Sequence, residues 1–319
     1  MCTAISYYTD SLYFGRNLDY ESSYGESVVI TPRKFPLSKT KDHYAMIGIA
    51  HVCDGYPLYY DGFNEKGLCI AGLNFTKSAV FGDKKDGFQN VAQYELIPRL
   101  LGTCANINEV SQTAETLNIT GERFKENMPA ARLHWMVADR NGTLVLEQTE
   151  SGLNVYDDPA GVLTNEPPFL QQMFALNDYM ALSPYPPKNS FAENMPLENY
   201  SRGMGAVGLP GDLSSKSRFV RAAFMRANSV CDGSDGQSIA QFFHLLGSVE
   251  QQRGAVRLDG EKCEITIYSS CMAPESGMYY FKTYNDPSVR SVSMKNTDLD
   301  GDSLYICPVT DSLHVTHLN

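Results

Sequence analysis

The sequence predicts a layered α+β fold formed by one domain over residues 1–319. Short β-rich runs dominate the first quarter, a pair of helical stretches follows, and this alternation of strands with helix pairs then occurs again. The chain has no internal repeat and no clean linker, and large two-layer sheets do reach this length as one domain. We therefore expect sheets covered by helices on their outer faces.

The first quarter of the chain has the pattern of strands and tight turns. Ile5–Tyr8 and Leu12–Asn17 are β-rich runs separated by Thr9-Asp10-Ser11, a combination that predicts a hairpin. Strands are then expected at Ser27–Thr31, Tyr44–His51 and Leu68–Asn74, with turns at Asp61-Gly62 and at residues 64–67. The last of these strands is apolar on both faces and should lie inside a sheet.

The rest of the chain alternates between helical and strand periods. Helices are expected at Val91–Cys104, Asn108–Leu117, Arg218–Ala227 with Ser217 as its N-cap, and Ser238–Leu246. Strands are expected at Leu133–Ala138, Thr143–Glu147, Leu153–Tyr156 and Gly161–Thr164, and through most of residues 263–319. Residues 165–216 are rich in Pro, Asn, Ser and Gly, which predicts helix fragments within a long surface excursion.

Charge and hydropathy argue against several classes of protein. A net charge of −11 and a pI near 5.0 argue against nucleic acid as the main partner. No run approaches the roughly 18 apolar residues of a membrane helix. Charged side chains at Asp10, Arg16, Asp19 and Glu21 interrupt any apolar core of a signal peptide. We therefore expect a cytoplasmic protein with no nucleic-acid or membrane partner.

The cysteines and histidines show no metal-binding pattern. Eight cysteines occur without a CxxC pair, so we expect reduced, mostly buried thiols. Six histidines occur without an HExxH motif, so we expect no metal site and no cofactor. Trp135 lies in an apolar run and is expected in the core. Its neighbour His134 has no cysteine or carboxylate partner recognisable from the sequence, which argues against a catalytic Cys–His pair.

The start of the chain carries the strongest chemical signal. Cys2 is small enough for Met1 to be trimmed during synthesis, and trimming would leave a thiol and a free α-amine on one carbon. An α-amino group has a pKa of about 7.7–8.0 and can accept the proton of a thiol. A thiol needs such a base or a cationic neighbour to become reactive.

The predicted hairpin would supply that neighbour. It folds Arg16 and Asp19 back towards the chain start, where Arg16 would favour a thiolate and Asp19 would hold the α-amine. In the alternative interpretation, Cys2 is an incidental early cysteine and Arg16–Asp19 is a surface turn. This stretch alone leaves both interpretations open.

Motifs along the whole chain extend the signal. They read, in order, MCTA, FGRNLDYE, DGFNEKGLCIAGLNF, LHWMVAD, VLEQTESGLNVYD, GVLTNEPPF, GLPGDLSSKSRFVRAAF and YSSCMAPESGMYYF. Together they resemble the choloylglycine hydrolase family, which contains bile salt hydrolases and penicillin V acylases. The resemblance implies an N-terminal-nucleophile (Ntn) hydrolase fold, a four-layer αββα sandwich of two antiparallel sheets flanked by helices. It also implies an amidohydrolase that needs no metal or cofactor.

The resemblance assigns six catalytic positions. They are Cys2 as nucleophile, Arg16 and Asp19 beside it, Asn74 in AGLNF, Asn165 in LTNEP, and Arg218 in SKSRF. Taken singly, Asn74 could end a strand, Asn165 could be a turn residue and Arg218 could lie on a solvated helix face. The family context favours the catalytic interpretation. Amide hydrolysis needs donors for a tetrahedral oxyanion, and the Asn74 side chain fits that role. Asn165 could anchor the substrate amide or the amine of Cys2.

The resemblance also implies a substrate class. Bile salt hydrolases generally have asparagine at the position of Asn74, where penicillin V acylases often have tyrosine, so we expect glycine- or taurine-conjugated bile salts. Residues expected to line an apolar steroid pocket are Leu18, Tyr20, Tyr24, Cys53, Tyr60, Phe124 and Met128. The polar stretch Lys125–Asn127 leaves open the choice between glycine and taurine and between a steroid and an aromatic acyl group.

Two other functions stay open at this point. The chain could act on penicillin V or another N-acyl amide, or it could be a catalytically silent relative that binds amphipathic acids. A free Cys2 without Met1 would favour hydrolysis over binding alone. Relatives often form homotetramers, and the resemblance implies the same assembly here.

Overall fold

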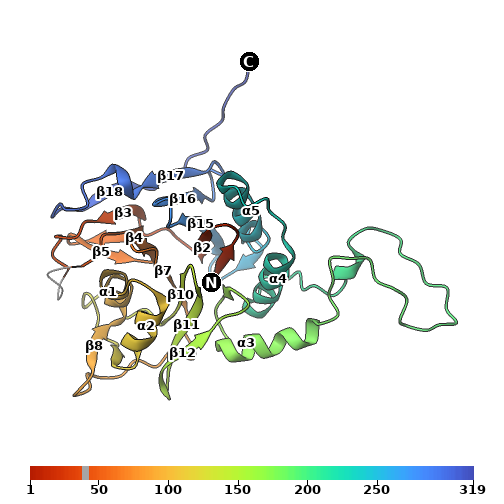
Figure 1. Ribbon diagram of the computed structural model, residues 1–319, viewed down its shortest axis with the longest axis horizontal. Helices are drawn as coiled ribbons and strands as arrows, with labels where there is room; N and C mark the ends of the chain where they lie inside the picture. The colour runs from red at the N-terminus through yellow and green to blue at the C-terminus, as the bar shows by residue number, and fades with distance from the viewer. Residues whose placement is uncertain (38–42) are drawn as a thin grey trace.

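The computed structural model describes residues 1–37 and 43–319 and shows two antiparallel sheets stacked between helices (Figure 1). The first sheet has seven strands in the described residues, in the order β13 (Val162–Leu163), β1 (Cys2–Tyr8), β2 (Leu12–Tyr20), β15 (Cys263–Ala273), β16 (Met278–Thr283) and β17 (Arg290–Ser293), with β14 (Val256–Arg257) on β15. The N-terminal hairpin therefore lies in the middle of this sheet, beside a strand from the far end of the chain.

The second sheet has nine strands in the described residues. Its order is β12 (Gly152–Asp157), β11 (Gly142–Thr149), β10 (Leu133–Asp139), β7 (Cys69–Asn74), β6 (Asp61–Asn64), β4 (Met46–Cys53), β3 (Ser27–Thr31) and β18 (Tyr305–Pro308), with β5 (Tyr56–Tyr59) on β4. The two sheets meet where β1 and β2 pack against β7. β1, the strand that begins with Cys2, thus lies at the interface between the sheets.

Helices cover the outer face of each sheet. α1 (Leu96–Thr103) and α2 (Ile107–Ala114) pack on the nine-stranded sheet, and α4 (Ser215–Asn228) and α5 (Asp235–Gly247) pack on the seven-stranded sheet (Figure 1). One apolar cluster lies between the sheets and under α4 and α5, and a second lies under α1 and includes the fully buried Trp135. The predicted αββα sandwich and the predicted core position of Trp135 are confirmed.

Four local predictions are wrong. Val91 lies in the short strand β8 (Gln89–Ala92), which pairs in parallel with β9 (Leu117–Thr120), so Leu117 also belongs to a strand. Apolar residues at the ends of a helical pattern fit a strand equally well, and here backbone pairing decided between the two. The N-cap of α4 is Ser214, whose Oγ accepts the Ser217 N–H at 3.4 Å, whereas Ser217 is the third residue of the helix. Asp61-Gly62 begins β6 and is no turn.

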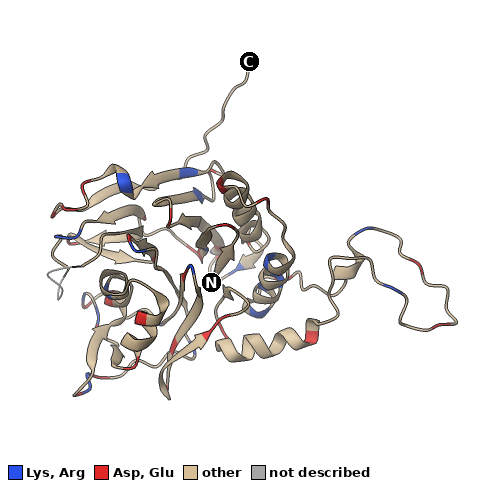
Figure 2. Cartoon of the chain, viewed as in Figure 1, with Lys and Arg blue, Asp and Glu red and all other residues tan. Residues whose placement is uncertain are grey.

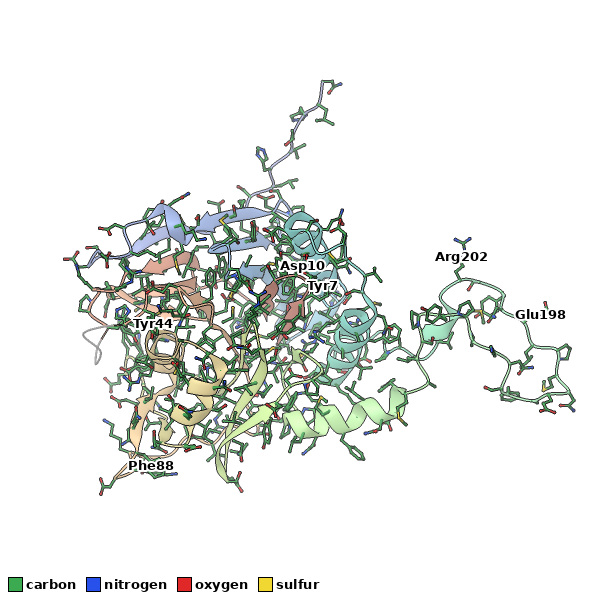
Figure 3. All side chains as sticks on the ribbon, viewed as in Figure 1. Tyr7, Asp10, Tyr44, Phe88, Glu198 and Arg202 are labelled. Carbon is green, nitrogen blue, oxygen red and sulfur yellow. The ribbon has the colours of Figure 1, made fainter. Side chains whose placement is uncertain are left out.

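Residues 165–216 form the expected excursion. They begin with α3 (Phe169–Ala175), and an arm of residues 183–205 then projects from the body of the molecule. The base of this arm is closed by the Ser183 N–H, which donates to the Gly205 carbonyl at 2.9 Å. Glu198 and Arg202 lie on the arm, far from the sheets (Figure 3). Residues 309–319 follow the last strand and carry no helix or strand.

Candidate active site

The β1–β2 hairpin places Arg16 directly on the sulfur of Cys2. In the strand register Cys2 faces Leu18 and Ala4 faces Arg16. The Arg16 Nη2 donates to the Cys2 Sγ at 2.6 Å, and only 2% of Cys2 and 1% of Arg16 is exposed. Burial acts to lower the pKa of Arg16, but the nearby sulfur and acidic groups raise it overall, so the guanidinium is charged. The hairpin predicted from the sequence is confirmed, and it delivers the cation that a reactive thiol requires.

Asn165 and Arg218 hold the main chain of Cys2. The Cys2 N–H donates to the Asn165 Oδ1 at 2.9 Å, and the Arg218 Nη1 donates to the Cys2 carbonyl at 2.6 Å. Arg218 also donates through Nη2 to the Asn165 Oδ1 at 2.8 Å and through Nη1 to the Thr3 Oγ1 at 2.5 Å. Arg218 comes from the first turn of α4, where Figure 2 shows several basic residues, and it is fully buried. The solvated helix face considered for Arg218 is therefore excluded.

Asp19 supplies the negative charge opposite Arg218. Its Oδ2 lies 3.9 Å from the Arg218 Nη1, and its Oδ1 accepts the Thr266 hydroxyl at 2.6 Å. The Gln251 Nε2 donates to the Oδ2 at 3.3 Å. Burial raises the pKa of Asp19, while Arg218 and the N-terminal amine lower it. The N-terminal amine, on Met1 in this structure, contacts the backbone of Asp19 rather than its carboxylate.

Asn74 ends β7 beside this cluster. The Asn165 Nδ2 donates to the Asn74 backbone carbonyl at 2.8 Å, which joins the two asparagines. Asn74 is half-buried at the end of its strand, where β7 pairs with β10 through Leu133. Asn74 thus lies at the edge of the buried cluster, a position suited to a residue that donates to a bound substrate.

The expected pocket residues fall into two groups. Tyr20 and Tyr24 contact each other with ring centroids 5.6 Å apart, and Tyr60 lies close enough to Tyr24 and Arg16 for their charges to influence its pKa, which burial raises. Leu18 is half-buried opposite Cys2. Of this group, the strand register places Leu18 opposite Cys2, and the role of these residues as a pocket wall stays a prediction. Tyr24 is the most open of them, with 53% of its surface exposed.

The second group lies on the loop that carries Phe124. The Phe124 ring packs on Tyr56 and Tyr94, with centroids 5.6 and 5.3 Å away. Lys125 pairs with Asp54 at 2.7 Å and lies beside Cys53. Met128 is half-buried at the next turn of the same loop. Phe124 and Lys125 thus attach this loop to the β4–β5 hairpin, where Cys53 lies. The charge of Lys125 is paired with that of Asp54.

The sequence did not predict the hydrogen bonds of His134, which lies next to the neighbours of Asn74 and Asn165. Both nitrogens of the fully buried His134 lie near acceptors, the Glu147 Oε1 at 3.0 Å and the Thr164 carbonyl at 2.9 Å. The imidazole stacks on Phe75 with centroids 4.3 Å apart. His134 therefore has a carboxylate partner, contrary to the sequence interpretation, and it contacts the neighbours of Asn74 and Asn165. Pairing of β10 with β11 brings it to Glu147, which single-strand patterns do not show.

A separate cavity of about 480 Å³ lies at the other end of the hairpin, lined by Tyr7–Asp10 and by residues 226, 227 and 229–233. Tyr7 and Asp10 are labelled in Figure 3. Tyr8 lies six positions after Cys2 along β1, roughly 20 Å away, so this cavity is not part of the cluster. Among the residues that the structure describes, no group of three His, Cys, Asp or Glu side chains could hold a metal ion. No helix within the described ranges is long and apolar enough to span a membrane.

The chain is similar to known proteins along almost its whole length. A bile salt hydrolase/transferase of Lactiplantibacillus plantarum is 50% identical over 314 residues, which cover 97% of each chain. A second bile salt hydrolase/transferase, from Clostridium perfringens, is 36% identical over 329 aligned residues and covers 100% of each chain.

Solved structures show the same similarity. A crystal structure of a mutant conjugated bile acid hydrolase from Clostridium perfringens matches with a TM-score of 0.93 and 35% identity over 100% of both chains. A penicillin V acylase from Agrobacterium tumefaciens matches with a TM-score of 0.73 and 20% identity over 96% of this chain and 90% of that one, which shows likeness of fold alone. The family model for linear amide C–N hydrolases of the choloylglycine hydrolase type matches residues 2–307. The chain therefore belongs to the choloylglycine hydrolase family.

Proposed function

We propose that this protein hydrolyses the amide bond of glycine- or taurine-conjugated bile salts, with Cys2 as its N-terminal nucleophile. The observation that carries the proposal is the contact of 2.6 Å between the Arg16 guanidinium and the Cys2 sulfur, inside a fully buried cluster that also fixes both backbone ends of Cys2. The full-length similarity to bile salt hydrolases supports the substrate class.

The cluster supports a thioester mechanism. The Cys2 thiolate attacks the carbonyl carbon of the conjugate, and the Asn74 side-chain amide donates to the oxyanion that forms. The C–N bond breaks as the amine of glycine or taurine takes a proton, which leaves the bile acid bound to Cys2 as a thioester. Water then attacks the thioester, and the free bile acid leaves with regeneration of the thiol. Arg16 stabilises the thiolate at both ends of this cycle.

The α-amine of Cys2 is the proton carrier in this proposal, and it is free only after Met1 is removed. In this structure the N-terminal amine is that of Met1, and burial lowers its pKa, although Cys2 and Asp19 raise it. After trimming, the amine of Cys2 would be buried in the same cluster. A lowered pKa increases the neutral fraction that can accept a proton at cellular pH. The Asn165 Oδ1, which accepts the Cys2 N–H at 2.9 Å, would then hold the amine in place.

Two measurements test the proposal against its alternatives. Intact-mass analysis of the purified protein should show that Met1 is absent, as hydrolysis by the α-amine requires. Side-by-side rates of amine release should favour a glycine- or taurine-conjugated bile salt over penicillin V at equal concentration. Faster turnover of penicillin V would overturn the bile-salt assignment, and binding of bile salts without any turnover would identify a silent binder.

We further propose that the chain forms a homotetramer from single 1–319 domains through its arm. The arm exposes large apolar side chains, and such patches commonly mark interfaces between proteins. The most exposed of them are Tyr185, Phe191 and Tyr200, each at least 75% exposed. Replacing residues 187–203 with two glycines, which keeps the closed base, should reduce the mass measured by light scattering to that of a smaller species. An unchanged mass would exclude the arm as the contact.

A cytoplasmic location is also proposed. All eight cysteines carry free thiols in the structure, which fits a reducing compartment. Cell fractionation with an antibody against the protein tests this location, and recovery outside the cytoplasm would contradict it.

A further inference from the structure

Asp61 is a fully buried carboxylate that joins the two sheets. From β15 and β16, the Tyr268 hydroxyl donates to its Oδ2 at 2.8 Å and the Tyr279 hydroxyl donates to its Oδ1. The Ser270 hydroxyl donates to Oδ2 at 3.3 Å and the Ile49 N–H donates to Oδ1 at 3.4 Å. These four donors come from both sheets and hold the Asp61 carboxylate in one position, because any shift of the carboxylate would break at least one of the hydrogen bonds.

The hydrogen-bond pattern favours the ionised form of Asp61. All four partners donate, and donors stabilise a carboxylate over a carboxylic acid. Burial and the neighbouring Asp61 raise the pKa of Tyr268 and of Tyr279, so both phenols keep the protons that they donate. Burial raises the pKa of Asp61 above its ordinary value, and Arg16 is the largest of the influences that oppose this rise. Among the described residues no cationic atom lies within 4.0 Å of this carboxylate, so Arg16 acts on it without direct contact.

Arg16 and Asp61 are connected through their neighbours. The Arg16 Nη1 donates to the carbonyl of Tyr60, the residue that precedes Asp61, at 3.2 Å, and to the carbonyl of Gly72 on the adjoining strand. The Arg16 backbone N–H donates to the Ser270 Oγ at 3.2 Å, and this is the hydroxyl that donates to Asp61. The position of the guanidinium therefore depends on the strand that carries Asp61.

The proposed catalytic cycle creates a need for a second anion near Arg16. This step rests on the proposed function, in which the Cys2 sulfur is acylated. A thiolate neutralises Arg16, but a thioester sulfur carries no charge, so acylation would leave a buried guanidinium unpaired. An unpaired buried charge is costly. Asp19 is already opposite Arg218 at 3.9 Å.

We propose that Asp61 is a positioning residue that serves as the permanent counter-charge of Arg16. The Tyr60 and Gly72 carbonyls hold the guanidinium beside Cys2, and Asp61 compensates its charge when the sulfur is acylated. The site then contains two buried cations, each with its own anion: Arg218 lies 3.9 Å from Asp19, and Arg16 is connected to Asp61 through Ser270. The Cys2 sulfur gains and loses its charge beside them.

The first test measures the reactivity of Cys2 in an Asp61→Asn variant, which keeps the shape but removes the charge. Iodoacetamide alkylation is followed against pH, and the N-terminal peptide is quantified by mass spectrometry. Loss of an anion makes the surroundings of the sulfur more positive, because Arg16, Arg218 and the amine stay while only Asp19 remains to oppose them. The midpoint of the alkylation profile should therefore move to lower pH by about one pH unit. An unchanged midpoint would overturn the proposal.

A matched control separates charge from general damage. Asp158 is another buried aspartate, at 6% exposure, but it faces Arg226 rather than the nucleophile. Asp158→Asn should leave the alkylation midpoint of Cys2 where it is in the parent protein. An equal shift in this control would show that the midpoint reports loosened packing, and the proposal would be lost. This readout needs no substrate, so it is independent of whether bile salts are turned over.

The second test measures stability through a double-mutant cycle. Asp61→Asn, Arg16→Met and the double variant are unfolded in urea. If the two residues are counter-charges, Asp61→Asn leaves the buried Arg16 cation without its anion, and Arg16→Met leaves the buried Asp61 anion without its cation. In the double variant neither charge is left. The double variant should then be more stable than the sum of the single effects by at least about tenfold in the unfolding equilibrium constant. Additive effects would refute the pairing. If Asp61→Asn does not fold, a double variant that is no more soluble than Asp61→Asn would refute it as well.

Discussion

Arg218 offers the sharpest test of the catalytic cluster, because one side chain connects three of its members. Its guanidinium donates to the Cys2 carbonyl, the Thr3 hydroxyl, the Asn165 Oδ1 and, through Nε at 3.0 Å, the Leu213 carbonyl. Arg218→Met keeps an unbranched side chain and removes every one of these donors. It also leaves Asp19 buried without its cation.

The expected loss is large in both stability and activity. Breaking a buried ion pair by removing one partner costs about 3–5 kcal/mol. Arg218→Met should therefore lower the free energy of unfolding by about this amount, and kcat should fall at least about a hundredfold because Cys2 and Asn165 lose their shared donor. Unfolding in urea and amine release from a conjugated bile salt measure the two effects at a temperature where the variant stays folded.

Arg221 provides the matched control on the same helix. It is almost as buried, but within the described residues it donates only to the carbonyls of Ser248, Pro210 and Asp212, away from Cys2. Arg221→Met should cost about 1.5–3 kcal/mol of stability and leave kcat within about threefold of the parent protein. A folded Arg218→Met protein that is as active as Arg221→Met would refute the catalytic role of this cluster.

Three further predictions concern single side chains. Cys2→Ala should reduce amine release to background, and Cys2→Ser should be severely impaired because a hydroxyl is a weaker acid than a thiol; appreciable activity in either would contradict the nucleophile assignment. Asn74→Ala should lower kcat by about 10²–10³ through loss of an oxyanion donor, and a rise in KM alone would refute that role. Burial raises the pKa of Asp158 to about 7, although the Gly161 N–H and Arg226 lower it. The stability from this raised pKa is full below the ordinary carboxyl pKa of about 4 and is lost as the pH rises through 7, at most about 4 kcal/mol. Asp158→Asn should flatten the dependence of the urea midpoint on pH in that range, and an equally steep profile would contradict it.

The parts of the site that local sequence predicts are those built by local structure. A β-rich run, a turn and a second β-rich run are enough to predict that Arg16 returns to Cys2, and the observed register does bring Arg16 onto the sulfur. Asn165 and Arg218 reach Cys2 only through β13 and α4, which pack on β1 from distant parts of the chain. Their place in the site came from resemblance to a family, because no spacing rule connects positions 163 and 216 residues apart.

Asp61 shows why the remainder could not be predicted. An Asp-Gly pair is a strong turn signal, and the sequence around it gives no sign of a buried strand. What makes a buried carboxylate tolerable here is a set of hydroxyls on Tyr268, Ser270 and Tyr279, more than 200 residues later in the chain. His134 and Glu147 give the same lesson at shorter range, since their contact depends on which strands pair. Polar side chains that pair between strands or between sheets do not change the hydrophobic periodicity of either strand, so the sequence pattern cannot predict them.

The structure also makes possible a test of the base that takes the thiol proton. Met1 continues β1 beside Asp19: its carbonyl accepts the Asp19 N–H at 2.9 Å, and its amine donates to the Asp19 carbonyl at 2.7 Å and pairs with Glu264. A residue ahead of Cys2 is thus accommodated without disturbing the hairpin. A large residue inserted between Met1 and Cys2, which would prevent trimming, should give a folded protein with normal stability.

In that extended protein the nitrogen of Cys2 is a planar amide. It can still donate to the Asn165 Oδ1, as it does at 2.9 Å here, but it cannot accept a proton. Arg16 still contacts the sulfur, so alkylation of Cys2 by iodoacetamide should persist while amine release from a conjugated bile salt falls to background. Arg16 is permanently charged and cannot replace the amine as a base. His134 cannot readily replace it either, since both of its nitrogens are engaged by Glu147 and Thr164. Full turnover by a mass-verified extended protein would therefore refute the α-amine mechanism, because the fold would be intact and only the base would have changed.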